Sequence, residues 1–283
     1  AGGLNTDGAI SGAVTATIDG SIQLTGGSNG DSYVQIGVGG SGSDGVKSGD
    51  VTVSGTSATL TGGTGAGSSV LIGNGGGATQ SADNASGSIT GNVSVTATAG
   101  AVSMSAAGAA ADNFAQIGAG GRGSVGAGNT INSTTSVITT GGGLTMNAAN
   151  AAYVQIGAGG HQVDVTSLSG DVTVNAGGAI SISGGAGQNR YAQIGNGGMG
   201  SFATKTGNTT VSGSSLLMTT GSGAGANVLI GLGGGMDQTN SNFATGALTG
   251  NVLVTTTTDG VTLNSASAGV QAFAQIGNGG LVS

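Results

Sequence analysis

The sequence predicts an all-β fold, a parallel β-helix (β-solenoid), and three observations lead to this prediction. A seven-fold internal repeat runs through the 283 residues, each unit carries short runs of alternating apolar and polar residues, and many of the 65 glycines separate these runs. Glutamate and proline are absent. Because glycine costs about 1 kcal/mol relative to alanine inside a helix, no helices are expected.

The repeated element is (Tyr/Phe)-(Val/Ala)-Gln-Ile-Gly-x-Gly-Gly, replaced by Val-Leu-Ile-Gly in two units. Ile36 and Ile194 lie 158 residues apart, and so do Ile72 and Ile230, so four units form a super-repeat whose copies are about residues 1–157 and 158–283. The expected organisation is one continuous solenoid over residues 1–283, a part of a longer repetitive chain. The seven isoleucines, 36 to 46 residues apart, are Ile36, Ile72, Ile117, Ile156, Ile194, Ile230 and Ile276.

Each unit contains runs rich in Val, Ile and Thr with a period of two, which is typical of strands. Between Gly160 and Gly198 these runs are QVDVTSL, DVTVN, AISIS and YAQIG, with glycine turns between them. Strands and turns that alternate at a fixed repeat, without a helical crossover, predict coils stacked at about 4.8 Å along one axis.

Two coils of about 19 residues per unit are expected, because one coil as long as a unit would leave a void around a single core about 10 Å thick. Roughly 15 coils would then form a rod on the order of 70 Å long. The alternative is one larger, flattened coil per unit, which would stack each YVQIG segment on its copies.

The alternation of side chains within the repeated element assigns the seven isoleucines to the core. The opposite face forms an aromatic and amide stripe. Its favoured interpretation is a set of side-chain ladders that stiffen the rod, and the alternative is an adhesive surface through which rods bundle or hold a ligand. The stripe consists of Tyr33, Gln35, Phe114, Gln116, Tyr153, Gln155, Tyr191, Gln193, Phe273 and Gln275.

The polar residues beside the glycines have predicted roles in the backbone. Asp and Asn alternate at the start of one strand, so a side-chain oxygen is needed there and an Asx turn is expected. The positions concerned are Asp50, Asn92, Asp171, Asn208 and Asn251. Within the Gly-x-Gly-Gly corner, the glycines allow a positive φ, and the asparagines between them tolerate the left-handed region too, at Asn74, Asn196 and Asn278.

One metal candidate is visible. Residues 39–47 match the calcium-binding nonapeptide GGxGxDxUx, with Asp44 at the acidic position. Calcium in such repeats takes its ligands from successive turns, and the related stretches 120–125 and 197–202 lack the aspartate. Calcium is therefore kept only as a candidate, and no cofactor is predicted. A phosphate site at the glycines would need a following helix, which is not expected.

Composition excludes several classes of function. With no cysteine and only His161, a thiol nucleophile or a Cys/His zinc site cannot be built. A net charge of −7 argues against nucleic acid, and no apolar run is long enough for a membrane span. The four bases lie in different units, away from any carboxylate pair, so no enzyme is expected. They are Lys47, Arg122, Arg190 and Lys205.

The repeated element, the GDVTV and GNVSV strands and the cysteine-free composition resemble those of large repetitive bacterial exoproteins, the filamentous-haemagglutinin-like adhesins and related cell-surface fibre proteins. The resemblance implies a right-handed β-helix on the bacterial cell surface or outside the cell. It implies a non-catalytic role in adhesion, biofilm matrix or fibre formation, with surface glycans or neighbouring or host cells as partners.

Exposed strand edges at the terminal coils add self-association into fibres, end to end or laterally, to the expected partners. Two alternative functions remain. An ice-binding solenoid would present Thr-x-Thr pairs on a flat face, as at residues 15–17 and 96–98, although such pairs do not recur in every unit. A carbohydrate-active β-helix is the second alternative.

Overall fold

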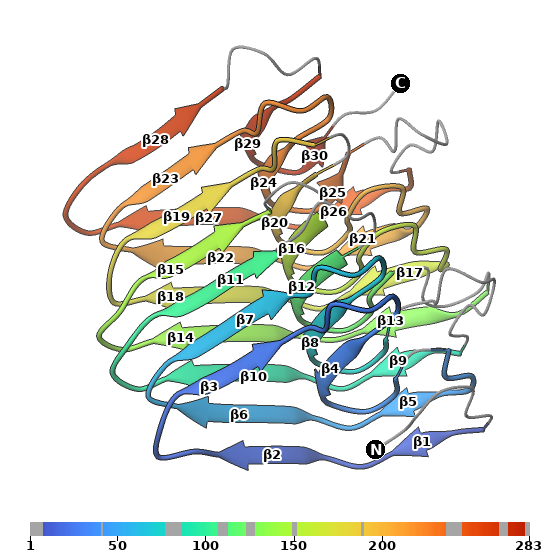
Figure 1. The fold of residues 1–283 in the computed structure, drawn as a ribbon. Coiled ribbons are helices and arrows are strands. Elements are labelled where there is room, and N and C mark those ends of the chain that lie inside the picture. The colour runs from blue at the N-terminus through green and yellow to red at the C-terminus, as the bar shows by residue number, and fades with distance from the viewer. Residues whose placement is uncertain are drawn as a thin grey trace.

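The computed structural model describes residues 8–40, 42–76, 87–106, 113–122, 128–148, 152–187, 190–235, 245–265 and 271–280. In these segments the chain forms strands and turns and no helix. All the strands pair in parallel, and they stack into a β-solenoid (Figure 1), which confirms the predicted fold class.

Four parallel sheets of seven strands each run through the molecule, and each coil contributes one strand to every sheet. Sheet A consists of β1 (Ile10–Ser11), β5 (Lys47–Ser48), β9 (Ile89–Thr90), β13 (Thr130–Asn132), β17 (Ser167–Ser169), β21 (Thr204–Thr206) and β26 (Leu248–Thr249). Sheet B consists of β2 (Val14–Thr17), β6 (Val51–Gly55), β10 (Val93–Ala97), β14 (Thr135–Thr139), β18 (Val172–Ala176), β22 (Thr209–Gly213) and β27 (Val252–Thr256).

Sheet C consists of β3 (Ile22–Thr25), β7 (Ala58–Gly62), β11 (Val102–Ala106), β15 (Leu144–Asn147), β19 (Ile180–Ser183), β23 (Leu216–Thr219) and β28 (Val261–Asn264). Sheet D consists of β4 (Tyr33–Ile36), β8 (Ser69–Ile72), β12 (Asn113–Ile117), β16 (Ala152–Ile156), β20 (Ala192–Ile194), β24 (Val228–Ile230) and β29 (Ala274–Ile276). A short ladder joins β25 (Gly233–Gly234) to β30 (Gly279–Gly280).

Each repeat unit forms one large coil, so the prediction of two coils of about 19 residues per unit is wrong and its alternative is correct. Ile36 pairs with Ile72, and Ile117 pairs with both Ile72 and Ile156, so each YVQIG element lies directly on its neighbours. Seven coils at about 4.8 Å give a length of about 34 Å, half the expected one.

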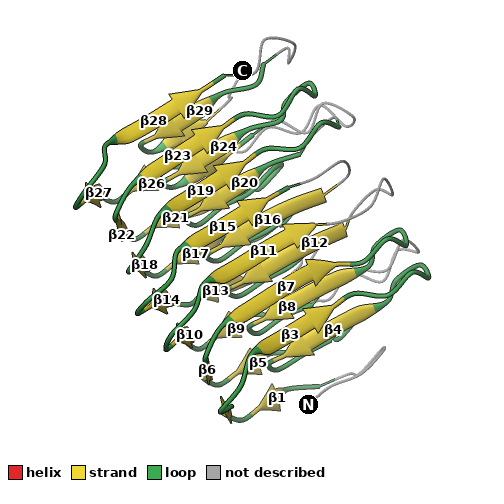
Figure 2. Ribbon diagram, turned by 60° about the vertical axis from the view of Figure 1, so that its left-hand side comes forward, coloured by secondary structure: helices red, strands yellow, loops and turns green. Residues whose placement is uncertain are grey.

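A large coil leaves no void because the chain folds its interior into three apolar compartments. The main core lies among sheets B, C and D. A second cluster joins sheet A to the corner that follows sheet D, and a third lies on the far face of sheet D. Sheets C and D lie side by side along the axis (Figure 2). The two-coil prediction assumed one core between two sheets, whereas sheet D is buried on both faces.

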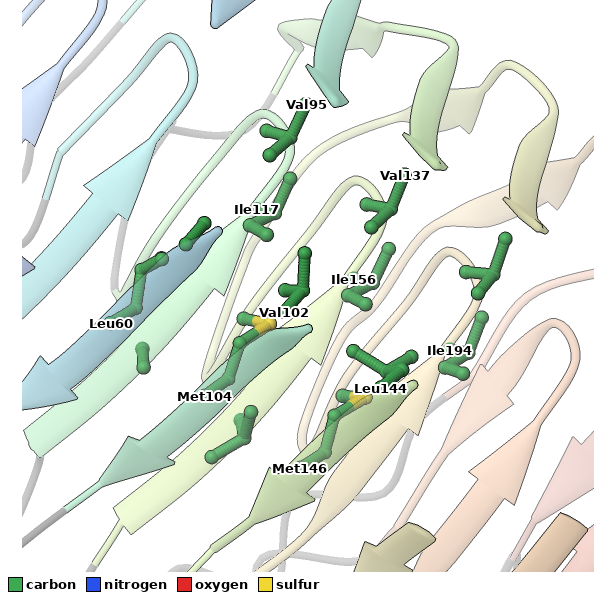
Figure 3. Packing of buried hydrophobic residues seen from close by; sticks show 14 of the residues in the cluster. Leu60, Val95, Val102, Met104, Ile117, Val137, Leu144, Met146, Ile156 and Ile194 are labelled. Atoms are coloured by element: carbon green, nitrogen blue, oxygen red, sulfur yellow. The ribbon is translucent and has the colours of Figure 1, made fainter. Parts of the chain in front are cut away.

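The main core is a set of columns in which equivalent side chains stack along the axis. Figure 3 shows Val95 and Val137 of sheet B, Met104 and Met146 of sheet C and three isoleucines of sheet D pointing into the same interior. Ile72, Ile117, Ile156, Ile194 and Ile230 are fully buried there, whereas Ile36 and Ile276 in the first and last coils are partly buried.

The corner after sheet D requires glycine for two reasons. Gly157 has a φ of +134°, in the region that side chains rarely adopt. A Cβ atom on Gly157 would also overlap the carbonyl oxygen of Gly195 in the next coil. The corners therefore stack backbone on backbone.

Ile156→Ala is expected to lower the free energy of unfolding by about 2 to 5 kcal/mol, because it leaves a cavity in a core column that neighbouring coils hold in place. Chemical denaturation followed by circular dichroism measures this loss. The control is Ile138→Ala on the outer face of sheet B, where the side chain is 36% exposed. A change of about 0.5 kcal/mol or less is expected there, and equal losses at both positions would contradict the assigned core.

Candidate functional site

The aromatic and amide stripe lies on the second face of sheet D and is buried in the inner coils. Phe114, Tyr153 and Tyr191 are at most 4% exposed and pack with Leu71 and Met199. Their rings stack in a column, with centroids 5.0 Å apart for each successive pair and planes 10° and 2° apart. Stacking at the spacing of the coils makes this column an aromatic ladder.

Glutamine side chains of the stripe bind the glycine corner of the next coil. Nε2 of Gln116 donates to the carbonyl oxygens of Gly157 and Gly159, at 3.1 and 3.2 Å. Nε2 of Gln193 repeats the pattern with Gly231 at 3.1 Å and Gly233 at 3.4 Å. The amides thus supply hydrogen bonds that the buried corner carbonyls would otherwise lack.

The tyrosine and glutamine ladders are joined to each other. The Tyr191 hydroxyl donates to Oε1 of Gln155 at 3.3 Å, and burial raises the pKa of Tyr191 well above its ordinary value. His161 packs edge-on against Tyr153, with ring centroids 6.4 Å apart, so it belongs to this cluster as well as to a turn.

This burial bears on the two interpretations of the stripe. In the inner coils the aromatic rings and amides face other parts of the chain, so they are not available to a ligand or to another rod. The geometry therefore favours stiffening ladders over an adhesive surface. The members in the terminal coils are only partly buried, namely Tyr33, Gln35, Phe273 and Gln275.

Asparagines in the Gly-x-Gly-Gly corner connect coils through their side chains. Oδ1 of Asn196 accepts from the amide of Ala158 at 2.9 Å, and its Nδ2 donates to the carbonyl of Gly170 at 2.6 Å. Asn74 and Asn278 make equivalent bonds. None of the three has a positive φ, so the corner does not use the left-handed conformation that asparagine tolerates. Asparagine is needed because its amide reaches across the corner.

The Asp and Asn residues before sheet B also act between coils. Oδ1 of Asp50 accepts from the amide of Asn92 at 2.8 Å, and Oδ1 of Asp171 accepts from the amide of Asn208 at 2.7 Å. The prediction that a side-chain oxygen matters agrees with this geometry. The predicted closure within one Asx turn is wrong, since these bonds run to the next coil.

Two buried lysines interrupt an otherwise aliphatic column of sheet A. Lys47 pairs with Ile10 and Ile89, and Lys205 pairs with Leu168 and Leu248. Both lysines are fully buried. They lie one super-repeat apart in the sequence, so they occupy the same place in equivalent coils.

The ammonium group of Lys205 is held by backbone carbonyls. Nζ donates to Ser201 at 3.0 Å, to Ala203 at 2.9 Å and, in the next coil, to Thr245 at 2.9 Å. Burial lowers the pKa of Lys205 to about 8. Burial also lowers the pKa of Lys47 to about 8, against an opposing effect of the Asp44 carboxylate. Each lysine thus places a positive charge inside a glycine-rich loop.

Sequence reasoning treated the bases as scattered and missed this site. The signal was present, because residues 39–47 and 197–205 share the pattern GGxGSxxxK. The same comparison explains the candidate calcium motif. Asp44 lies near the Lys47 ammonium, and Phe202 stands in its place in the second loop. Ser41 of the motif lies outside the described residues.

The described segments contain no group of three or more His, Asp, Glu or Cys side chains placed to hold a metal ion. They also contain no helix with the length and apolar character needed to cross a membrane. The aromatic and amide ladders, the corner asparagines Asn74 and Asn196 and the two lysines are buried in the inner coils.

No protein-family model, no curated protein and no solved structure matches this chain.

Gln155→Leu is expected to lower the free energy of unfolding by about 1 to 3 kcal/mol, because the buried carbonyls of Ala158 and Gly195 lose the Nε2 donor. Leucine fits this register, since Leu71 and Leu229 occupy it in other coils. Thermal or urea unfolding measures the loss. Gln23→Leu on the exposed face of sheet C is the matched control, and a loss of the same size there would refute the role of the amide ladder.

The buried lysine predicts a rise in stability with pH. The ordinary pKa is 10.5 and the folded value about 8, so between these values the unfolded chain holds a proton that folded Lys205 has lost. The free energy of unfolding is expected to increase by about 2 kcal/mol through Lys205 between about pH 8 and 9.5. Above about pH 10, ionisation of unfolded tyrosine opposes this rise, because folded Tyr191 resists ionisation.

Urea unfolding at a series of pH values measures this dependence. Lys205→Met is expected to reduce the slope, since Leu168 and Leu248 show that this column accepts an aliphatic residue. Thr204→Met, on the exposed neighbour, should keep the full slope. An unchanged slope in Lys205→Met would show that Lys205 is not the titrating group.

Proposed function

We propose that this protein is a non-catalytic structural rod that assembles end to end into a cell-surface or extracellular filament. The observation that carries the proposal is the continuity of the four ladders up to the last coil, which offers the next coil the same surface that every inner coil offers its neighbour.

Among the described residues, the side chains of sheet C are more exposed in the seventh coil than in the sixth. Val261 and Leu263 of β28 are each 43% exposed, whereas Leu216 and Met218, one coil earlier in the same columns, are almost fully buried. The difference arises because coil seven covers coil six. A further coil, from a second copy of the chain, would bury Val261 and Leu263 in the same way and gain the hydrophobic stabilisation that each inner interface has.

The glutamine ladder also differs between the inner coils and the last coil. Nε2 of Gln193 reaches two carbonyls of the next coil, whereas Nε2 of Gln275 donates within its own corner, to Asn278 at 3.4 Å. In the first coil Val14, Ala16, Val34 and Ile36 are only partly buried. In the described residues the strands of the first and last coils pair on one side only, while Ile22 and Leu24 of the first coil are almost fully buried, so the proposed stacking of the two ends rests on their strand edges.

The proposed location outside the cell is argued from the sequence. The likeness of the repeated element and composition to filamentous-haemagglutinin-like exoproteins supports a location outside the cell, in adhesion, biofilm matrix or fibre formation. The burial of most functional side chains inside the ladders supports a structural role over a catalytic one. The adhesive contacts, with glycans or with other cells, would then belong to the outer faces and loops.

Electron microscopy and sedimentation velocity at rising protein concentration test the assembly. Rods with lengths in multiples of about 34 Å are expected, with the longer species increasing at higher concentration. A double variant, Val261→Lys with Leu263→Lys, is expected to remain as single rods, because each new contact would desolvate two ammonium groups.

The matched control adds the same two charges to the outer face of sheet C, as Thr59→Lys with Thr145→Lys, where both side chains are exposed. This control should assemble as the unaltered protein does. The proposal fails if the unaltered protein stays a single short rod at every concentration, or if the end variant assembles equally well.

A further inference from the structure

The outer face of sheet B carries a column of hydroxyl groups that ends at Leu253, which is 57% exposed in the seventh coil. The register of the strands stacks one Ser or Thr per coil through six consecutive coils. These residues are Thr15, Thr52, Ser94, Ser136, Thr173 and Thr210. All six are exposed or partly exposed, because their neighbours in each strand point into the main core.

A second column runs beside the first, two residues further along each strand. It carries hydroxyls at Thr17, Ser54 and Thr96, is interrupted by Ile138 and Asn175, and resumes at Ser212 and Thr255. Positions two apart in a strand are separated by about 6.6 Å, and successive coils by about 4.8 Å. The two columns thus form a net of hydroxyl and methyl groups with these spacings, broken at Ile138 and Asn175.

The outer face of sheet B presents groups that can hydrogen-bond to ordered water, and its strands present no charged side chains. Each hydroxyl can both donate and accept a hydrogen bond. No strand of sheet B presents a charged side chain, so the face has no attraction for phosphates or anionic lipids.

Other occupants would need side chains that sheet B does not present. Flat polysaccharide sites and protein interfaces depend on aromatic anchors. The strands of sheet B contain none, and Phe114, Tyr153 and Tyr191 are buried behind sheet D.

We propose that the outer face of sheet B binds ice. The rigid backbone holds the hydroxyls and threonine methyls at repeating positions, so water between them is ordered before contact and can join a growing lattice with little further loss of entropy. Thr15 and Thr17 lie in the two columns, and Ser54 and Ser94 continue these columns from coil to coil.

Ice binding and rod assembly are separate properties. The hydroxyl face lies along the side of the solenoid, whereas assembly uses its ends, so either property can fail without the other. End-to-end stacking would lengthen the face and increase its contact with ice.

Thermal hysteresis and inhibition of ice recrystallisation test the proposal on the purified chain. The unaltered protein is expected to show hysteresis that grows with concentration. A double variant, Thr52→Lys with Thr173→Lys, is expected to lose it, because two hydrated ammonium groups would stand above the net. Both positions face outward, so circular dichroism should show an intact β fold in this variant.

The matched control places the same charges on the neighbouring sheet C, as Thr59→Lys with Thr145→Lys, and should keep the hysteresis. Hysteresis no greater than that of serum albumin would overturn the proposal. Equal loss in both double variants would overturn the assignment to sheet B. Binding to microcrystalline cellulose or chitin, without hysteresis, would show instead that the face recognises a polysaccharide.

Discussion

The in-register pairing of each coil with its copy is the constraint on which the rest of this structure depends. Because strand pairs with strand at equivalent positions, every side chain lies against its counterpart from the next unit, as Ile117 lies against Ile156. Each column therefore consists mostly of side chains of one kind. Aliphatic residues fill the core, aromatic rings stack, and glutamine amides donate to carbonyl oxygens of the next coil. At the corners, where backbones meet directly, Gly157 has room for no side chain.

Sheet D is buried on both faces and divides the interior of the coil, so small side chains can fill the space on each side of it. Ile156 points into the main core, while Tyr153 and Gln155 on the same strand enter a second interior. The second interior is polar as well as aromatic: Nε2 of Gln155 donates to a corner carbonyl, and its Oε1 accepts from the Tyr191 hydroxyl. The coil thus divides into compartments, each narrow enough to pack.

Polar groups inside this solenoid hold successive coils together. Asn196 links a corner to the end of a sheet A strand, and Lys205 draws together carbonyls from two coils. Their hydrogen bonds offset the cost of burying an amide or an ammonium group in an apolar column. The outer faces, by contrast, carry the neutral hydroxyls through which a rod of this kind would meet its surroundings.

The sequence by itself determined the fold class, the repeat unit and the inward direction of the isoleucines, because like-on-like stacking requires a period and an alternation that can be read directly. The tertiary structure alone decided the number of coils per unit, the burial of the stripe and the surroundings of Lys205. Alternation shows that the two faces of a strand differ, but not what covers the second face. That depends on where the chain returns after the glycine corner, and the next return brings the carbonyl of Thr245 to the Lys205 ammonium group beside the local carbonyls of Ser201 and Ala203.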